Sequence, residues 1–204
     1  MNGDLKVLVK SVGYDASVEV YTKQTMDFVD YMSDEISIAY FLTPGVEVSD
    51  DMSKIVTVSW FVPGVTGNEF GPIPGGSWIL DEAAVKANGA YWGQYRHRSI
   101  KYAVEHPKEY EAYPLWNEVS GGVFAVIPQP DIPMTPENWG IVHGDAHPDN
   151  WKIETLGTDQ YSYSAIDFDT SNKNFYLIDV GTIVWYANTG LYYGGENSQP
   201  VADY

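Results

Sequence analysis

Two short segments dominate this chain of 204 residues: His143-Gly144-Asp145-Ala146-His147-Pro148-Asp149-Asn150-Trp151 and Ile166-Asp167-Phe168-Asp169. Together they set carboxylates, an amide and a histidine at short, fixed spacings. The four fixed positions of H-G-D-x-x-x-x-N alone occur by chance in roughly one chain in a thousand of this size. We therefore interpret the two segments as parts of one functional site.

The spacing of these residues is the one used by sites that transfer phosphoryl groups. In such sites an H-x-D-x-x-x-x-N loop supplies an Asp that accepts the proton of a substrate hydroxyl and an Asn that holds Mg²⁺, and a later D-F-x segment supplies another metal ligand. The predicted catalytic base is Asp145, and the predicted metal ligands are Asn150 and Asp167. Mg²⁺ prefers such hard oxygen ligands. Asp169 is either a further ligand or a brace of its loop.

The flanking residues predict that both segments are loops held by strands. Residues 139–142 form a short apolar run before the first segment, and residues 164–166 lead into Asp167, so one small rigid sheet is expected to carry the site. His143 is expected to anchor the loop by hydrogen bonds rather than to perform chemistry. His147 and Asp149 are expected to shape the turn around a proline.

These residues resemble the motifs of the aminoglycoside phosphotransferase and choline kinase group, within the protein-kinase-like fold. His143-Gly144-Asp145 with Asn150 is similar to that family's catalytic loop, and Asp167-Phe168-Asp169 to its metal-binding segment. The resemblance continues into Leu177-Ile178-Asp179-Val180-Gly181, where the family enters a helix with an Asp near its start. We interpret Asp179 as a structural capping residue and not as a ligand.

The resemblance spans residues 127–187 clearly and is looser upstream. It implies an α+β, protein-kinase-like two-lobe fold with a reduced N-terminal lobe and a mainly helical C-terminal lobe. It also implies transfer of the γ-phosphoryl group of ATP or GTP, with Mg²⁺, to a hydroxyl of an aminoglycoside-like, choline-like or sugar-like small molecule.

A division near residues 61–64 separates the two expected lobes. Residues 1–64 are predicted to form a β-rich N-terminal lobe with one helix, and residues 65–204 a helical C-terminal lobe with both motifs. Strands are predicted over Leu5–Lys10, by alternation, and over Ile55–Phe61. Between them one face of a helix is marked by the 0, 3, 4, 7 spacing of Thr25, Phe28, Val29 and Met32.

The second part of the chain is predicted to begin with a long helix, from Asp81 to about Val104. Pro107 opens the next helix at its first turn, and residues 121–136 form a proline-rich connector. His97 and His106 are expected to be ordinary surface groups. The tyrosines at 161, 163, 192 and 193 are expected to fill the core or strand edges.

Lys10 is the best match to the nucleotide-binding lysine of kinases, which pairs with ATP phosphates and with a Glu on the following helix. A solvated lysine at the end of a strand is an equally good interpretation. The helix pattern puts Thr25 where the Glu should face inward, which leaves Glu19 and Glu35 as substitutes. By comparison with the family, both ends of the chain are short. A catalytically inactive kinase-like protein that binds a nucleotide or a partner is therefore an alternative.

A metal-dependent phosphoester hydrolase is the second alternative. Its two-metal cluster would be drawn from His143, Asp145, His147, Asp149, Asp167 and Asp169. Such sites usually recruit further histidines from distant loops, and the two others in this chain lie in a helical region. This alternative also leaves Asn150 and Phe168 without a reason for their positions.

Composition limits the remaining possibilities. A net charge of −17 argues against a nucleic-acid partner and would suit a cationic substrate, although a surface that is acidic only for solubility is the preferred interpretation. The absence of cysteine excludes disulfides and thiol catalysis and fits a reducing compartment. No run resembles a signal peptide or reaches membrane-spanning length, so no membrane association and a soluble cytoplasmic protein are expected.

Overall fold

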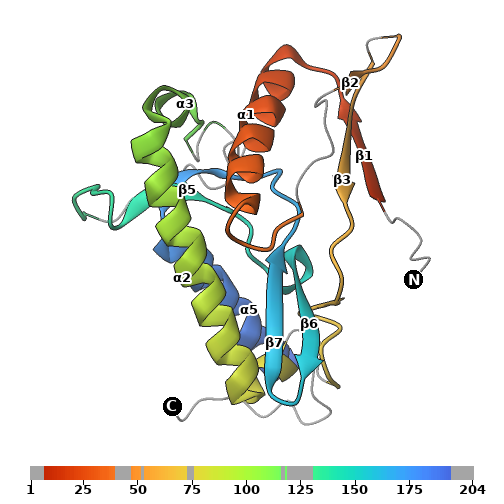
Figure 1. Ribbon diagram of the computed structural model, residues 1–204, viewed down its shortest axis with the longest axis vertical. Helices are drawn as coiled ribbons and strands as arrows, with labels where there is room; N and C mark the ends of the chain where they lie inside the picture. The colour runs from red at the N-terminus through yellow and green to blue at the C-terminus, as the bar shows by residue number, and fades with distance from the viewer. Residues whose placement is uncertain are drawn as a thin grey trace.

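The computed structural model describes residues 7–39, 47–51, 53–72, 76–115, 118 and 131–193 (Figure 1). Leu5, Lys6, residues 121–130 of the predicted connector and the side chains of Tyr192 and Tyr193 lie outside the description. The elements in chain order are β1 (Val7–Gly13), α1 (Ala16–Ser33), β2 (Glu47–Val48), β3 (Lys54–Trp60), β4 (Val65–Thr66), η1 (Ser77–Leu80), α2 (Glu82–Glu105), α3 (Pro107–Ala112), β5 (Trp139–Val142), η2 (Pro148–Asn150), β6 (Trp151–Gly157), β7 (Gln160–Ala165), β8 (Asn172–Phe175) and α5 (Leu177–Tyr193).

The first sheet has the strand order β1-β3-β2, and all its pairs are antiparallel. The two strands predicted within residues 1–64 are confirmed as β1 and β3. Lys10 of β1 lies opposite Thr57 of β3. The alternation in β1 does not mark a buried face, because Val7, Leu8 and Val9 are all exposed. In Figure 1 this sheet is drawn to the right of α1.

The strands that flank the two motifs belong to two separate sheets, not to one as expected. β5 pairs with β8, whereas β7 pairs with β6, which in turn pairs with β4. The predicted strand at residues 139–142 is confirmed as β5, and β7 ends at Ala165, just before the second motif. The part of the chain after residue 64 therefore contains five strands within the described residues as well as helices.

Helix α1 shows the predicted amphipathic pattern, since Thr25, Phe28, Val29 and Met32 are buried. It begins after Asp15, whose side chain accepts a hydrogen bond from the Ser17 amide at 2.8 Å and so satisfies one free N–H of the first turn.

Helix α2 confirms the predicted long helix, and Asp81 caps it by accepting from the amides of Ala83 and Ala84. Pro107 opens α3 as predicted. The buried Arg98 of α2 fixes the end of α1, donating to the Tyr31 carbonyl at 2.7 Å and to Glu35 at 2.5 Å. The two long helices are thereby held at a defined point.

The core is rich in aromatic side chains packed between α1, α2 and the strands around the motifs. The ring of Phe28 meets Tyr95, Tyr102 and Tyr113 edge to face, a favourable arrangement of ring quadrupoles. Tyr163 is buried as predicted. Among the described residues, no helix has the length and apolar character needed to cross a membrane.

Candidate active site

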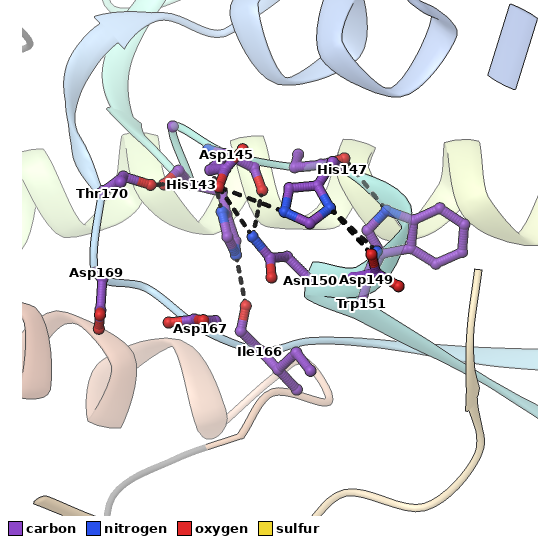
Figure 2. Close-up of polar contacts among 12 residues, drawn as sticks. His143, Asp145, His147, Asp149, Asn150, Trp151, Ile166, Asp167, Asp169 and Thr170 are labelled. Atoms are coloured by element: carbon purple, nitrogen blue, oxygen red, sulfur yellow. Dashed lines mark hydrogen bonds and ion pairs between the residues drawn. The ribbon is translucent and has the colours of Figure 1, made fainter. Parts of the chain in front are cut away.

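His143 anchors the first motif with both ring nitrogens (Figure 2). Its side chain is fully buried, Nδ1 accepts a hydrogen bond from the Asp145 amide at 3.3 Å, and Nε2 lies 2.7 Å from the Ile166 carbonyl oxygen. Because Nδ1 is an acceptor, the proton resides on Nε2, which donates to that carbonyl. His143 thus joins the residue before Asp167 to the loop of the first motif, which is the anchoring role expected for it.

The turn at Gly144 needs glycine. Its φ is +84°, and a Cβ there would lie 2.3 Å from the Thr170 carbonyl oxygen and 2.6 Å from Asn172 Nδ2. The left-handed region and this close approach both exclude a side chain. The loop therefore packs tightly against the backbone that follows the second motif.

Asp179 holds this turn from helix α5. Its buried carboxylate accepts hydrogen bonds from the backbone amides of His143 at 2.8 Å and Gly144 at 3.0 Å. Burial raises the pKa of Asp179, an effect opposed by the His143 ring and by those two amides. Asp179 is structural, as predicted, but the described hydrogen bonds of its carboxylate go to the loop of the first motif and not to the amides of its own helix, so it does not act as the predicted cap.

Asp145 and Asn150 are brought together by the loop (Figure 2). The Asn150 side-chain nitrogen donates to the Asp145 carbonyl oxygen at 2.9 Å and to its carboxylate at 3.2 Å. Because the amide nitrogen makes both bonds, Asn150 Oδ1 faces away from Asp145. The Asp145 carboxylate itself is 43% exposed and stays accessible.

His147 and Asp149 shape the loop, in line with the role predicted for them. His147 Nδ1 accepts from the Asp149 amide at 3.3 Å, and Nε2 lies 3.5 Å from the Asp145 carboxylate. The His147 ring also packs on Tyr186 of α5 at 5.3 Å. The His147 side chain therefore supports the turn that carries Asp145, and Asp149 contributes its backbone amide.

The second motif bends sharply at Asp167, whose φ is +61°. A residue other than glycine in this region is uncommon and must be maintained by its surroundings. Phe168 supplies part of that support, since its buried ring packs against His143 at 4.5 Å. The bend turns Phe168 into the core while Asp167 and Asp169 stay exposed.

Lys10 of β1 reaches the second motif across the site. Its ammonium lies 2.7 Å from Asp167 Oδ1 and also contacts Asp169 Oδ2. Partial burial acts to lower the pKa of Lys10, but the hydrogen bonds to the two carboxylates outweigh it, so its pKa lies above the ordinary value. The interpretation of Lys10 as a solvated lysine at a strand end is therefore wrong.

Neither predicted substitute for the helix acid lies at Lys10. Glu19 pairs with Lys23 at 2.6 Å, and Glu35 pairs with Arg98 at 2.5 Å and with Lys101 at 3.1 Å. Glu19 is one turn from its lysine on the same helix, and Glu35 lies beyond the end of α1. Within the described part of α1 no acid pairs with Lys10, and its partners come from the second motif instead.

Three site residues escaped the sequence analysis: Tyr21, Tyr113 and Ser171. The Tyr21 hydroxyl bonds the carbonyls of Phe168 and Ser171, and Tyr113 bonds the Ser171 hydroxyl. The one sequence signal for Tyr21 is its spacing: it lies one helical turn before Thr25 and therefore on the same face of the helix.

The side chains of Asn150, Asp167 and Asp169 carry hard oxygen donors. Mg²⁺ uses a few such donors when water and phosphate oxygens complete its shell. In the described ranges, no group of three or more His, Cys, Asp or Glu side chains is arranged to hold a metal.

The two-metal hydrolase cluster is not formed by its six candidate residues. All six are described, yet they do not gather around a common point. His143 uses both ring nitrogens for protein hydrogen bonds, which leaves it none for a metal. His143 is therefore not available as a ligand of such a cluster, and the described residues give this alternative no support.

No protein-family model matches this chain, and no curated protein matches it in sequence. A solved structure that resembles it is the GDP complex of wild-type aminoglycoside 2'-phosphotransferase-IIIa, with a TM-score of 0.56 and 13% identity. The match covers 96% of this chain and 79% of that one. At this identity the likeness shows a shared fold and not a shared family. The chain is thus a mixed helix and strand protein with a kinase-like fold.

Proposed function

We propose that this chain is a small-molecule phosphotransferase, which moves the γ-phosphoryl group of a nucleoside triphosphate to a hydroxyl group. The observation that carries the proposal is the joined pair of Asp145 and Asn150 in a loop tied to the second motif, through the His143 bond to the Ile166 carbonyl. The kinase-like fold of the structural neighbour supports it. In this proposal residues 1–64 and 65–204 are two lobes with the nucleotide between them.

The reaction assigns Asp145 the role of general base. The acceptor hydroxyl oxygen forms a bond to the γ-phosphorus while the bond from that phosphorus to the β,γ-bridging oxygen breaks. The hydroxyl proton passes to the Asp145 carboxylate, and the nucleoside diphosphate leaves with the bonding electrons. Asp145 suits this role because its carboxylate is exposed while the backbone that carries it is fixed.

Asn150 and Asp167 would hold Mg²⁺, with Asp169 as a further ligand or a brace. When bound, the ion neutralises charge on the phosphate oxygens. Lys10 would bind the same phosphates, because its ammonium already lies between β1 and the metal-binding segment. This arrangement needs Lys10 to exchange its carboxylate partners for phosphate oxygens when the nucleotide enters.

The acceptor proposed is a small hydroxyl compound, and a cationic one suits a chain with a net charge of −17. ATP and GTP both remain candidates for the donor. The GDP bound in the neighbouring phosphotransferase is a property of that protein and makes guanine nucleotides worth testing here.

Thermal unfolding with ATP and with GTP, each with and without Mg²⁺, tests the nucleotide site. A ligand at a hundredfold its dissociation constant adds about 2.7 kcal/mol to the free energy of unfolding. We expect a Mg²⁺-dependent rise in the unfolding temperature that is lost in Asp167→Ala. It should persist in Asp30→Ala, which removes one carboxylate from an exposed position on α1. No rise with either nucleotide in the unaltered chain contradicts the proposal.

The second candidate is a kinase-like protein that binds nucleotide without turnover. It is favoured by the double contact of Lys10 with Asp167 and Asp169 and by the lack of a helix acid at Lys10 in the described part of α1. A Mg²⁺-dependent nucleotide site without phosphoryl transfer to any hydroxyl acceptor would support this candidate over the enzyme.

A further inference from the structure

The hydroxyl of Tyr21 connects helix α1 to the metal-binding segment. It lies 2.9 Å from the Ser171 carbonyl oxygen and 3.2 Å from the Phe168 carbonyl oxygen. A phenol has one proton, so the two carbonyls share it in a three-centre bond. Burial raises the pKa of Tyr21, which keeps the hydroxyl protonated as a donor.

The two carbonyls that Tyr21 binds are the ends of one turn. The Ser171 amide donates to the Phe168 carbonyl at 3.1 Å and so closes the turn. Tyr21 therefore bonds the first and the last residue of this turn. The Phe168 carbonyl lies between the residues that carry the two exposed carboxylates. Holding this turn therefore holds the backbone from which Asp167 and Asp169 project.

The same contacts extend to the strand that precedes the catalytic loop. The Ser171 hydroxyl donates to the Val142 carbonyl of β5 at 2.8 Å, and the Tyr113 hydroxyl bonds Ser171 at 3.0 Å and Thr25 at 3.3 Å. Tyr113, Ser171 and Thr25 are all buried. A chain of hydroxyl groups thus runs from α1 to both motifs.

We infer that Tyr21 is a positioning residue of the site, whose hydroxyl sets the metal-binding segment against helix α1. In kinases this helix and the nucleotide lysine are joined by an ion pair. Here Lys10 binds the metal-binding segment directly, and Tyr21 makes the link from the helix to that segment. The expected effect of Tyr21 on the binding of Mg²⁺ and nucleotide rests on the proposed function. The hydrogen bonds from Tyr21 to the segment are independent of that function.

The expected effect is on metal-dependent binding. Asp167 has a backbone conformation that its surroundings must maintain, and Tyr21 binds the next carbonyl along the chain. Without the hydroxyl, the segment samples other conformations, and a ligand that needs both Asn150 and Asp167 binds less well. A ligand bound without Mg²⁺ should be affected little.

Tyr21→Phe tests this inference, with Tyr31→Phe as its matched control. The Tyr31 hydroxyl belongs to the same helix but bonds Glu105 at 2.7 Å, away from the segment. ADP and GDP are titrated with and without Mg²⁺. In Tyr21→Phe the gain in affinity due to Mg²⁺ should fall about five- to tenfold, as expected for one hydrogen bond, with metal-free affinity unchanged. Tyr31→Phe should alter neither quantity.

Hydrogen exchange of the Ser171 amide tests the link without any ligand. It should be about five- to tenfold faster in Tyr21→Phe than in the unaltered chain and unchanged in Tyr31→Phe. Equal exchange in both variants overturns the inference, as does an equal loss of metal-free and metal-dependent nucleotide affinity. If the unaltered chain binds neither ADP nor GDP, the proposed function fails, and the exchange of Ser171 alone decides the role of Tyr21.

Discussion

The ammonium of Lys10 lies 2.7 Å from Asp167 Oδ1, although the two residues are 157 positions apart in the chain. A second contact, to Asp169, sets the positive charge between two carboxylates of the second motif. The ammonium therefore neutralises the carboxylates that we propose as metal ligands. In the proposed function Lys10 competes with the metal before the nucleotide enters and then binds the phosphates.

Lys10→Met should strengthen metal binding in the absence of nucleotide. The substitution keeps an unbranched side chain and removes the competing charge, so the affinity for Mn²⁺ should rise by about two- to fivefold, in keeping with the small energies of exposed ion pairs. Nucleotide affinity should fall. Titration followed by electron paramagnetic resonance measures free Mn²⁺. Lys23→Met, which removes a lysine paired with Glu19, is the control, and weaker Mn²⁺ binding in Lys10→Met would falsify the competition.

The ion pair of Lys10 should contribute to stability at neutral pH and lose its contribution in strong base. The pKa of Lys10 is raised above the ordinary value of 10.5, so the folded state favours the charged form. The contribution is complete below the unfolded pKa and disappears as the pH rises through the folded pKa. The measurement is the difference in free energy of unfolding between the unaltered chain and Lys10→Met. A difference that stays constant or grows up to about pH 12 contradicts this.

Asp145→Asn should slow turnover strongly and preserve nucleotide binding. The amide has the shape of the carboxylate but cannot take the hydroxyl proton, so kcat should fall by about 10²- to 10⁴-fold. The affinity for nucleotide with Mg²⁺ should change less than about twofold, because Asp145 is not among the expected ligands. Asp149→Asn, in the same loop, is the control. An unchanged kcat in Asp145→Asn would show that the base is elsewhere.

The sequence predicted the elements near the motifs because local signals determine them. The buried stripe of α1, the Asp81 cap of α2 and the apolar run of β5 each depend on neighbouring residues. The loop residues were predicted for the same reason, since Asp145 and Asn150 interact within five positions.

Contacts between distant segments were not predictable in this way. β8 lacks an apolar pattern, because its buried residues include Asn172, Lys173 and Asn174. The Lys173 ammonium is satisfied by a tertiary bond to the Glu111 carbonyl at 2.7 Å, whereas Asn172 and Asn174 bond the backbone of neighbouring residues. The pairing of β5 with β8, and of Lys10 with the second motif, arises only when the chain is folded. Tyr21 was missed for the same reason.

Asp179→Asn should loosen the loop of the first motif. A carboxylate accepts from both the His143 and Gly144 amides, whereas an amide side chain has one acceptor oxygen and turns an N–H group toward the other donor. One unsatisfied buried amide costs about 1–3 kcal/mol of the free energy of unfolding. Denaturant unfolding measures this loss. Asp15→Asn is the matched control, since Asn serves equally well at the start of a helix, and equal stability of both variants would argue against the role of Asp179.

Gly144→Ala should destabilise the chain and remove nucleotide binding. An alanine at φ +84° has an unfavourable backbone, and its Cβ would lie 2.3 Å from the Thr170 carbonyl oxygen, which cannot move without shifting the segment after Asp169. Together these effects should cost at least about 2 kcal/mol of the free energy of unfolding.

The opposite result is expected for Gly89→Ala on α2, where a Cβ meets nothing within 4 Å. In a helix interior this change should add about 0.5–1 kcal/mol to the free energy of unfolding. Urea unfolding of both variants measures the contrast. If Gly144→Ala is as stable as the unaltered chain, the loop has a different backbone from the one described, and the placement of Asp145 opposite the second motif must be abandoned.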